Sequence, residues 1–154
     1  MLGVTYNTEH KMVRCIAYKG GYKYQLKSDY VCRIPVIPQA AIQTEYTSLS
    51  ATGDITIKKG YAWDGPSGPT IDTPTFMRGS LVHDALYQLM REGHLDHGTY
   101  REAADRALRA ICREDGMWSI RAWWVYQGVR LFANPASNPA DERPLTFAPK
   151  GCQE

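Results

Sequence analysis

The sequence predicts an α+β fold, in which an N-terminal antiparallel β-sheet packs on a C-terminal half made of three helices. Short β-rich segments fill residues 1–62, and a loop followed by helical patterns fills residues 63–133. The chain has 154 residues, of which 44% are hydrophobic and 22% charged, so it is long enough for one globular domain with a hydrophobic core. We therefore expect a single domain over residues 1–133 and an extended, proline-rich tail over residues 134–154.

The β-rich half contains five candidate strands. They are residues 11–18, 22–26, 30–37, 41–46 and 54–58. Gly20-Gly21 separates the first two and suits the positive φ angles of a tight hairpin turn. Pro35 and Pro38 make the third an edge strand or an interrupted one. The last alternates clearly, which places Ile55 and Ile57 on one face of the sheet.

Three helices are expected in the second half. Thr75 can cap the first, which runs to about Glu92, and the capping-box pattern Thr99–Glu102 begins the second, which runs through Cys112. Ser119–Phe132 forms the third. Its aromatic residues suit either a membrane-facing patch or the core, and helical spacing favours the core; they are Trp118, Trp123, Trp124, Tyr126 and Phe132.

Composition narrows the classes of function. The net charge is only +2, and Lys and Arg are interspersed with Asp and Glu, so we expect no nucleic-acid partner. The chain shows no signal peptide and no apolar segment of membrane-spanning length, which suggests synthesis in a cytoplasm. The four cysteines have no zinc-ligand spacing. Reduced core thiols are favoured over a disulfide between Cys15 and Cys32.

A His-Asp pair and a distant aspartate carry the chemistry. His83 and Asp84 are adjacent, so on a helix their side chains diverge by roughly 100° and can serve two neighbouring roles. Tyr87 lies one turn beyond His83 on the same face. Asp105 can reach His83 if the two helices pack antiparallel, as their short connection favours. A carboxylate on one ring nitrogen leaves the other free to take a proton from water.

The loop before the first helix suits a hard cation. Residues 60–69 read GYAWDGPSGP, and a glycine-rich turn can direct several backbone carbonyls toward one point. Calcium prefers such oxygen ligands, to which Asp84 adds a carboxylate and Asp64 can add another. The alternative is a tight turn that only joins the sheet to the helix.

These residues together resemble the phospholipase A2 signature, most closely the version found in parvovirus capsid proteins. The matching motifs are Gly60-Tyr61 with Gly65-Pro66 and Gly68, then His83-Asp84-Ala85-Leu86-Tyr87, then Ala103-Ala104-Asp105. The resemblance implies that His83 is the general base and that Asp105 orients it with support from Tyr87. It also implies that Asp84 and the loop residues Tyr61, Gly65 and Gly68 bind calcium, and that phospholipid is the substrate.

A second resemblance covers more of the chain. The β-rich half, the G-Y-x-x-D-G-x-S loop, the H-D-x-L-Y helix and the A-D helix are similar to a small protein family of unknown function that occurs in tailed phages and prophages. Asp64, which the phospholipase pattern lacks, matches this family. The resemblance implies a protein made in the host cytoplasm and incorporated in a virion, with other virion proteins as partners.

Two functions remain open from the sequence. In the first, the protein is a virion-associated enzyme for calcium-assisted ester hydrolysis. In the second, it is a structural tail or neck protein in which the same residues hold the loop to the helices. Other chemistries fit less well: a metal phosphohydrolase of the HD type needs a further upstream histidine, and His94 and His97, which flank a turn, suit surface positions better than a zinc site.

Overall fold

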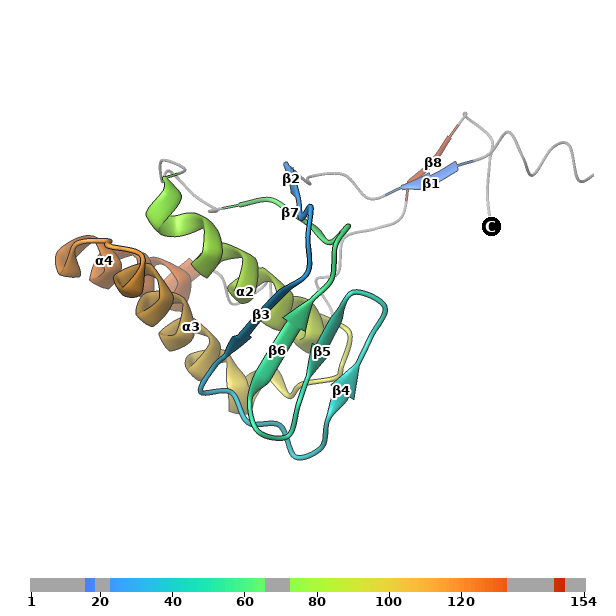
Figure 1. Cartoon of the computed structure of the whole chain (residues 1–154), viewed down its shortest axis with the longest axis horizontal. Helices are drawn as coiled ribbons and strands as arrows, with labels where there is room; N and C mark the ends of the chain where they lie inside the picture. The colour runs from blue at the N-terminus through green and yellow to red at the C-terminus, as the bar shows by residue number, and fades with distance from the viewer. Residues whose placement is uncertain (1–15, 19–22, 66–72, 133–145, 149–154) are drawn as a thin grey trace, which may run out of the picture. The chain divides into compact units, whose positions relative to one another are not determined.

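The computed structural model describes residues 16–18, 23–65, 73–132 and 146–148, which fall into two separate units. The larger unit holds residues 23–65 and 73–132, and the smaller one holds the two short remaining segments. In the larger unit antiparallel strands are followed by three helices (Figure 1), which confirms the α+β class.

The smaller unit is a two-stranded antiparallel ribbon. Strand β1 (Ile16–Tyr18) pairs with strand β8 (Thr146–Ala148), so that a segment near the start of the chain pairs with one from the proline-rich tail. The expected hairpin between the first two β segments is therefore wrong in its pairing, and the Gly20-Gly21 turn lies outside the described residues. Strand β2 (Tyr24–Gln25) pairs instead with β7 (Ala62–Trp63). A turn dipeptide is a local signal, and it carries no information about competing partners far away in sequence, such as β8 for β1 and β7 for β2.

Four strands form the main sheet, in the order β3-β6-β5-β4 (Figure 1). Their bounds are Tyr30–Arg33 for β3, Ile42–Gln43 for β4, Thr47–Leu49 for β5 and Asp54–Ile57 for β6. β3 ends two residues before Pro35, which has no backbone N–H to donate to a ladder. Strand β5 was not expected; it begins after a tight turn closed by Thr44 and Thr47.

The three helices are α2 (Pro74–Arg91), α3 (His97–Glu114) and α4 (Ser119–Phe132). α4 has the expected bounds, whereas the starts of the other two differ. Thr73 precedes α2 and Pro74 opens it, which suits proline because the first helical N–H needs no partner within the helix. α3 is capped by Asp96, whose carboxylate accepts the backbone N–H of Thr99, so the expected Thr99 cap is wrong by three residues.

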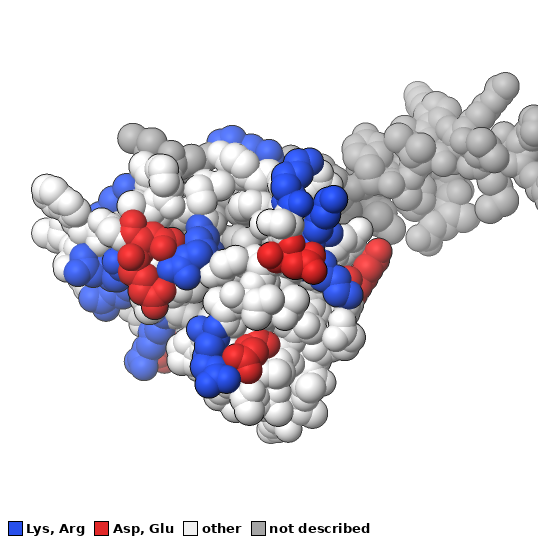
Figure 2. Space-filling view, in the orientation of Figure 1, with Lys and Arg blue, Asp and Glu red and all other residues white. Residues whose placement is uncertain are grey.

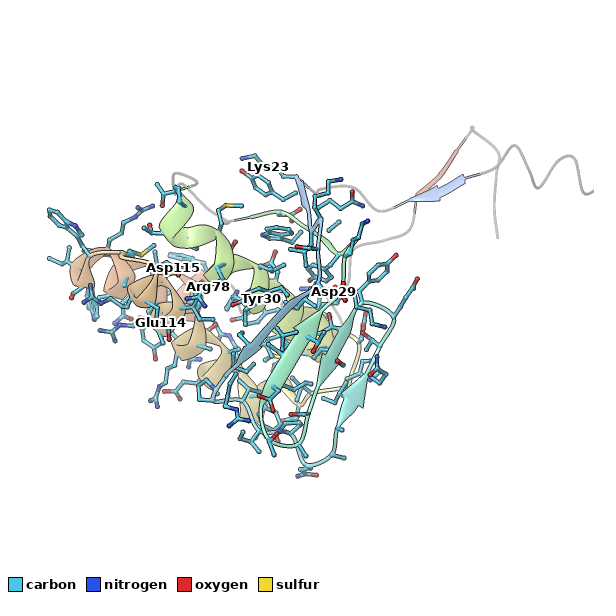
Figure 3. The ribbon with its side chains drawn as sticks, viewed as in Figure 1. Lys23, Asp29, Tyr30, Arg78, Glu114 and Asp115 are labelled. Carbon is cyan, nitrogen blue, oxygen red and sulfur yellow. The ribbon has the colours of Figure 1, made fainter. Side chains whose placement is uncertain are left out.

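The contacts of one arginine, Arg78, show that α2 and α3 run antiparallel. Arg78, in the second turn of α2, forms a forked ion pair with Asp115 at the end of α3, with N–O distances of 2.8–3.1 Å (Figure 3). It also bonds Glu114 and the Tyr30 hydroxyl of β3. These contacts bring the start of α2 to the end of α3 and fix both helices to the sheet.

The main core lies between the four-stranded sheet and α2. The alternation of β6 is confirmed, because Ile55 and Ile57 are both fully buried. On the helix side, buried residues cover most of the surface of α2, which lies between the sheet and α3; they include Leu81, Val82, Ala85, Leu86, Leu89 and Met90. A smaller core joins Phe76 and residues near the end of α3 to α4.

The aromatic residues of α4 do not form the core that their spacing favoured. Only Ala122 and Val125 of this helix are buried. Trp124 is 65% exposed and Phe132 is 81% exposed, and Trp118 and Trp123 are exposed as well. Ala122 and Val125 pack in the smaller core, and Tyr126 is half-buried, with the Arg109 guanidinium of α3 5.8 Å from its ring centroid.

Within the described residues, no helix has the combination of length and apolar character needed to cross a membrane. Cys32 and Cys112 carry free thiols, as expected for reduced cysteines. Because the Cys32 thiol is free, Cys32 does not take part in the alternative disulfide; Cys15 itself lies outside the described residues.

Candidate functional site

The His83 and Asp105 side chains meet between α2 and α3. His83 Nε2 lies 2.7 Å from Asp105 Oδ1, and the Tyr87 hydroxyl donates to the same oxygen at 2.6 Å. The His83 and Tyr87 rings are in contact, with centroids 4.0 Å apart and ring planes tilted by 38°. The expected contact between the histidine and the distant aspartate is therefore present, and Tyr87 joins it.

Helix periodicity and chain reversal explain this meeting. His83 and Tyr87 are four residues apart, so both side chains leave the same face of α2. The short connection between α2 and α3 is held by Leu89, whose carbonyl accepts the backbone N–H groups of His94 and Leu95. α3 therefore returns along α2 and places Asp105 beside both side chains.

Two arginines reach the other oxygen of Asp105. Arg130 of α4 donates to Asp105 Oδ2 at 3.3 Å, and the Arg101 guanidinium lies 4.0 Å from the same atom. Arg101 also reaches the Tyr87 hydroxyl at 3.4 Å. Sequence reasoning missed both arginines. The position of Arg101 four residues before Asp105 was an available signal, whereas Arg130 depends on how α4 crosses α3.

Asp105 is a fully buried carboxylate that stays ionised. Burial alone would raise its pKa, but hydrogen bonds from His83 and Tyr87 and the positive charge of Arg101 lower the pKa below its ordinary value. The same arrangement raises the pKa of the Tyr87 hydroxyl, because burial and the adjacent negative charge both oppose loss of its proton. Since an ionised carboxylate can only accept, His83 Nε2 carries the proton in this contact.

Asp84 points away from this cluster and toward the loop that follows β7. Its carboxylate accepts a hydrogen bond from the backbone N–H of Asp64. Burial of the carboxyl group is the main cause that raises the pKa of Asp84 to about 6. The nearby negative charge of Asp64 adds to the increase, and electrostatic interactions with the His83 and Arg91 side chains reduce it. Two carboxylates therefore lie near one another at the start of the loop, as expected.

The loop itself is described only up to Gly65. Tyr61 is 5% exposed, and its carbonyl accepts the backbone N–H of Leu26. Gly65 has a φ of +74°, and a Cβ atom added there would lie 2.5 Å from the Tyr24 ring, so the chain needs glycine at this point. Gly68, the last of the expected loop ligands, lies outside the described residues.

The oxygen atoms near Asp84 are of the type that binds a hard cation. Asp64 and Asp84 offer carboxylate oxygens, which calcium prefers, and a cation between them would relieve the charge repulsion that contributes to the raised pKa of Asp84. The part of the chain that the structure describes contains no group of three or more His, Cys, Asp or Glu residues arranged for a metal. Calcium takes six to eight oxygens, so backbone carbonyls and water would have to supply the remainder.

A surface depression of about 280 Å³ lies elsewhere, between Pro35 and α3. Its lining includes Thr99, Glu102, Ala103 and Arg106 but none of the residues that surround Asp105. We do not associate it with the His83 site, because its described lining includes none of His83, Tyr87 and Asp105.

Comparison with known proteins identifies a family. No curated protein matches the chain, and no solved structure matches it. A family model described as "Protein of unknown function (DUF1353)" matches residues 39–129, a range that contains Asp64, His83, Asp84, Tyr87 and Asp105. Because this match spans more than half of the sequence, the chain belongs to the DUF1353 family, whose function is unknown.

Proposed function

We propose that this protein hydrolyses an ester bond, with phospholipid as the expected substrate class and calcium as the expected cofactor. The observation that carries the proposal is the 2.7 Å contact between His83 Nε2 and Asp105 Oδ1, next to a separate carboxyl group at Asp84. A histidine held by a buried carboxylate on one nitrogen, with a cation ligand as its neighbour in sequence, is the arrangement that the phospholipase resemblance implies.

The residues divide the work as follows. Asp105 accepts a hydrogen bond from the Nε2–H group of His83, which leaves the Nδ1 lone pair as the base. That nitrogen takes a proton from water, and the water oxygen attacks the ester carbonyl. Asp105 and Tyr87 hold the imidazole in one tautomer and stabilise the imidazolium that forms. The imidazolium then returns the proton to the departing alkoxide, which restores the neutral histidine.

Asp84 and Asp64 would hold the calcium ion, together with carbonyls of the loop. When bound, calcium supplies positive charge that stabilises the oxyanion formed from the ester carbonyl. Deprotonated Asp84 is the form that binds it, so protons compete with the cation near and below the pKa of about 6 of that carboxyl group.

A phage virion is the setting we propose for this activity. The support is the G-Y-x-x-D-G-x-S loop and the H-D-x-L-Y helix, which resemble proteins of tailed phages and prophages. Hydrolysis of membrane phospholipid would serve entry into a host or release from it, and other virion proteins would be the partners of the chain.

Burial of the dyad favours a second candidate function, a structural role in the virion. His83 is 6% exposed and Asp105 is 0% exposed, and the arginines around them join α3 to α4. In a structural protein this network would only hold the three helices together. It would need neither calcium nor a path for water.

Release of fatty acid from phospholipid vesicles distinguishes the two functions. We expect the wild-type protein to hydrolyse the vesicles in calcium and to lose this activity in chelator. His83→Gln should abolish hydrolysis and remain folded, whereas His94→Gln, at a partly exposed histidine in the turn after α2, should leave it unchanged. A wild-type protein with no calcium-dependent hydrolysis, and a His83→Gln protein with a lowered melting temperature, would favour the structural role.

A further inference from the structure

We propose that Arg130 is a positioning residue, which holds the Asp105 carboxylate in the orientation that pairs it with His83. Docking of α4 is then a condition for the geometry of the dyad. The inference rests on the proposed function for its catalytic meaning, but the contact it concerns can be observed without any substrate.

The two oxygens of Asp105 are divided between different helices. Oδ1 accepts from His83 and Tyr87, which both belong to α2. Oδ2 accepts from Arg130 of α4 at 3.3 Å and lies 4.0 Å from Arg101 of α3. A carboxylate fixed through both oxygens cannot rotate, so the arginine side of the group sets the direction of the oxygen that meets His83.

Arg130 differs from Arg101 in what it connects. Arg101 is on the same helix as Asp105, four residues earlier, and therefore moves with it. Arg130 comes from another helix and is the cross-helix cation in this set. Its side chain is 32% exposed, whereas that of Asp105 is 0% exposed, so Arg130 supplies positive charge to a carboxylate that is shielded from bulk solvent.

The last turn of α4 is held in place so that Arg130 can make this contact. Arg101 donates to the backbone carbonyls of Val129 at 2.9 Å and of Arg130 at 2.6 Å. The last carbonyls of a helix have no hydrogen-bond donor within the helix, and a guanidinium can supply the missing N–H groups. One arginine thus docks the end of α4, and the other extends from that end to Asp105.

The test is the ring N–H signal of His83 in protein labelled with ¹⁵N-histidine, at neutral pH and without substrate. The signal is assigned by its absence in His83→Gln. In the wild type we expect a protonated Nε2 whose proton exchanges slowly with water, because it is buried against Asp105. Arg130→Gln should lose this signal or show rapid exchange, while the protein stays folded.

Three comparisons make the result decisive. Arg106→Gln removes an exposed arginine of α3 that pairs with Glu102, and it should leave the His83 signal unchanged. Arg130→Met, which keeps the apolar stem of the side chain, replaces Arg130→Gln if that variant does not fold, and should lose the signal too. Arg130→Lys keeps the charge and should retain part of the protection.

A lowered melting temperature with an unchanged His83 signal in Arg130→Gln would overturn the inference, because a purely structural contact gives that result. The hydrolysis assay tests the proposed function separately, so its failure can be distinguished from failure of the positioning role. Loss of the His83 signal in Arg130→Gln, in a protein that hydrolyses no ester, would support the positioning role and remove its proposed purpose.

Discussion

The pKa values of Asp105 and Asp84, two carboxyl groups of one site, are shifted in opposite directions. Asp105 is buried but receives hydrogen bonds from α2 and α4 and lies near the positive charge of Arg101, so its pKa is lowered. The Asp84 carboxyl is partly desolvated by burial and has a second acid nearby, so its pKa is raised to about 6. One group is fixed as an anion, and the other changes charge between pH 4 and pH 7. In the proposed mechanism, this difference suits the first group to orienting His83 and the second to binding a cation.

The raised pKa of Asp84 predicts a particular pH dependence of stability. The folded protein holds a proton on Asp84 up to about pH 6, whereas the unfolded chain releases it near its ordinary pKa of 3.8. In chelator, stability should therefore be highest below pH 4 with respect to this group and should fall as the pH rises to 6. The shift corresponds to about 1–3 kcal/mol of unfolding free energy. Asp84→Asn should remove this fall, as measured by urea unfolding at pH 4 to 7.

Asp54→Asn is the control for this experiment. The Asp54 carboxyl is exposed and paired with Arg33, which lowers its pKa to about 2, so Asp54→Asn can shift the stability as a whole but should leave the decline between pH 4 and 6 in place. An Asp84→Asn protein with the same decline between pH 4 and 6 as the wild type would show that Asp84 is not the group responsible.

At the level of elements, α2 and α3 approach closely at Gly79. A Cβ atom added there would lie 2.8 Å from the Cys112 sulfur and 2.9 Å from a Leu108 methyl group. Gly79→Ala gains up to about 1 kcal/mol of helix propensity. Overpacking typically costs 1–3 kcal/mol, so we expect a net loss of about 1 kcal/mol. Chemical denaturation would measure it.

Gly128 in α4 provides the matched control for that substitution. Among the described residues, no atom lies within 4 Å of a Cβ added at Gly128, so Gly128→Ala should stabilise the protein by up to about 1 kcal/mol. Opposite signs at the two glycines would support the packing described for α2 and α3. Stabilisation by Gly79→Ala would mean that the helices are less closely packed.

Some elements could be predicted from the sequence and others could not. The bounds of α4 and the buried face of β6 follow from local periodicity, and the structure has both. The starts of α2 and α3 were misplaced by two or three residues, because several polar residues near each start can act as a cap. The pairing of β1 with β8 could not be predicted, since nothing local links segments separated by most of the chain.

For the site, the same division between local and distant signals holds. His83, Tyr87 and Asp105 meet because helical spacing and a short connection bring them together, and both signals are in the sequence. The contribution of Arg130 depends on how α4 docks, which no local pattern encodes. The catalytic and metal-binding roles stay predictions, because they depend on ligands and on chemistry beyond the contacts themselves.

On the scale of the whole molecule, the charged side chains on the face that Figure 2 shows do not indicate a binding surface for a strongly charged partner. Basic and acidic side chains alternate there, without a broad patch of one sign. The apolar side chains that remain exposed are concentrated on α4 and the residue before it, with Trp118, Trp124 and Phe132 among them. The observations that bear on function therefore come from the buried network and from Asp84.

Calcium binding should stabilise the whole fold. A ligand that binds only the folded protein adds about 2.7 kcal/mol at a free concentration of 100 times its Kd, which raises the melting temperature by several degrees. We expect this increase for the wild type at pH 7.5 and a smaller one at pH 5, where Asp84 is protonated. Differential scanning calorimetry would measure it. An equal increase in Asp84→Asn would place the ion elsewhere.

The most direct test of the account is whether His83 and Asp105 act as one catalytic unit. Fatty acid release from phospholipid vesicles in calcium is measured for the wild type, His83→Gln, Asp105→Asn and the double variant. We predict that His83→Gln loses at least about 10²-fold in rate, as expected for a missing general base. The double variant should be no slower than His83→Gln alone, because groups that act together are not additive. Wild-type hydrolysis that His83→Gln retains in full, or no hydrolysis by the wild type, would contradict the account.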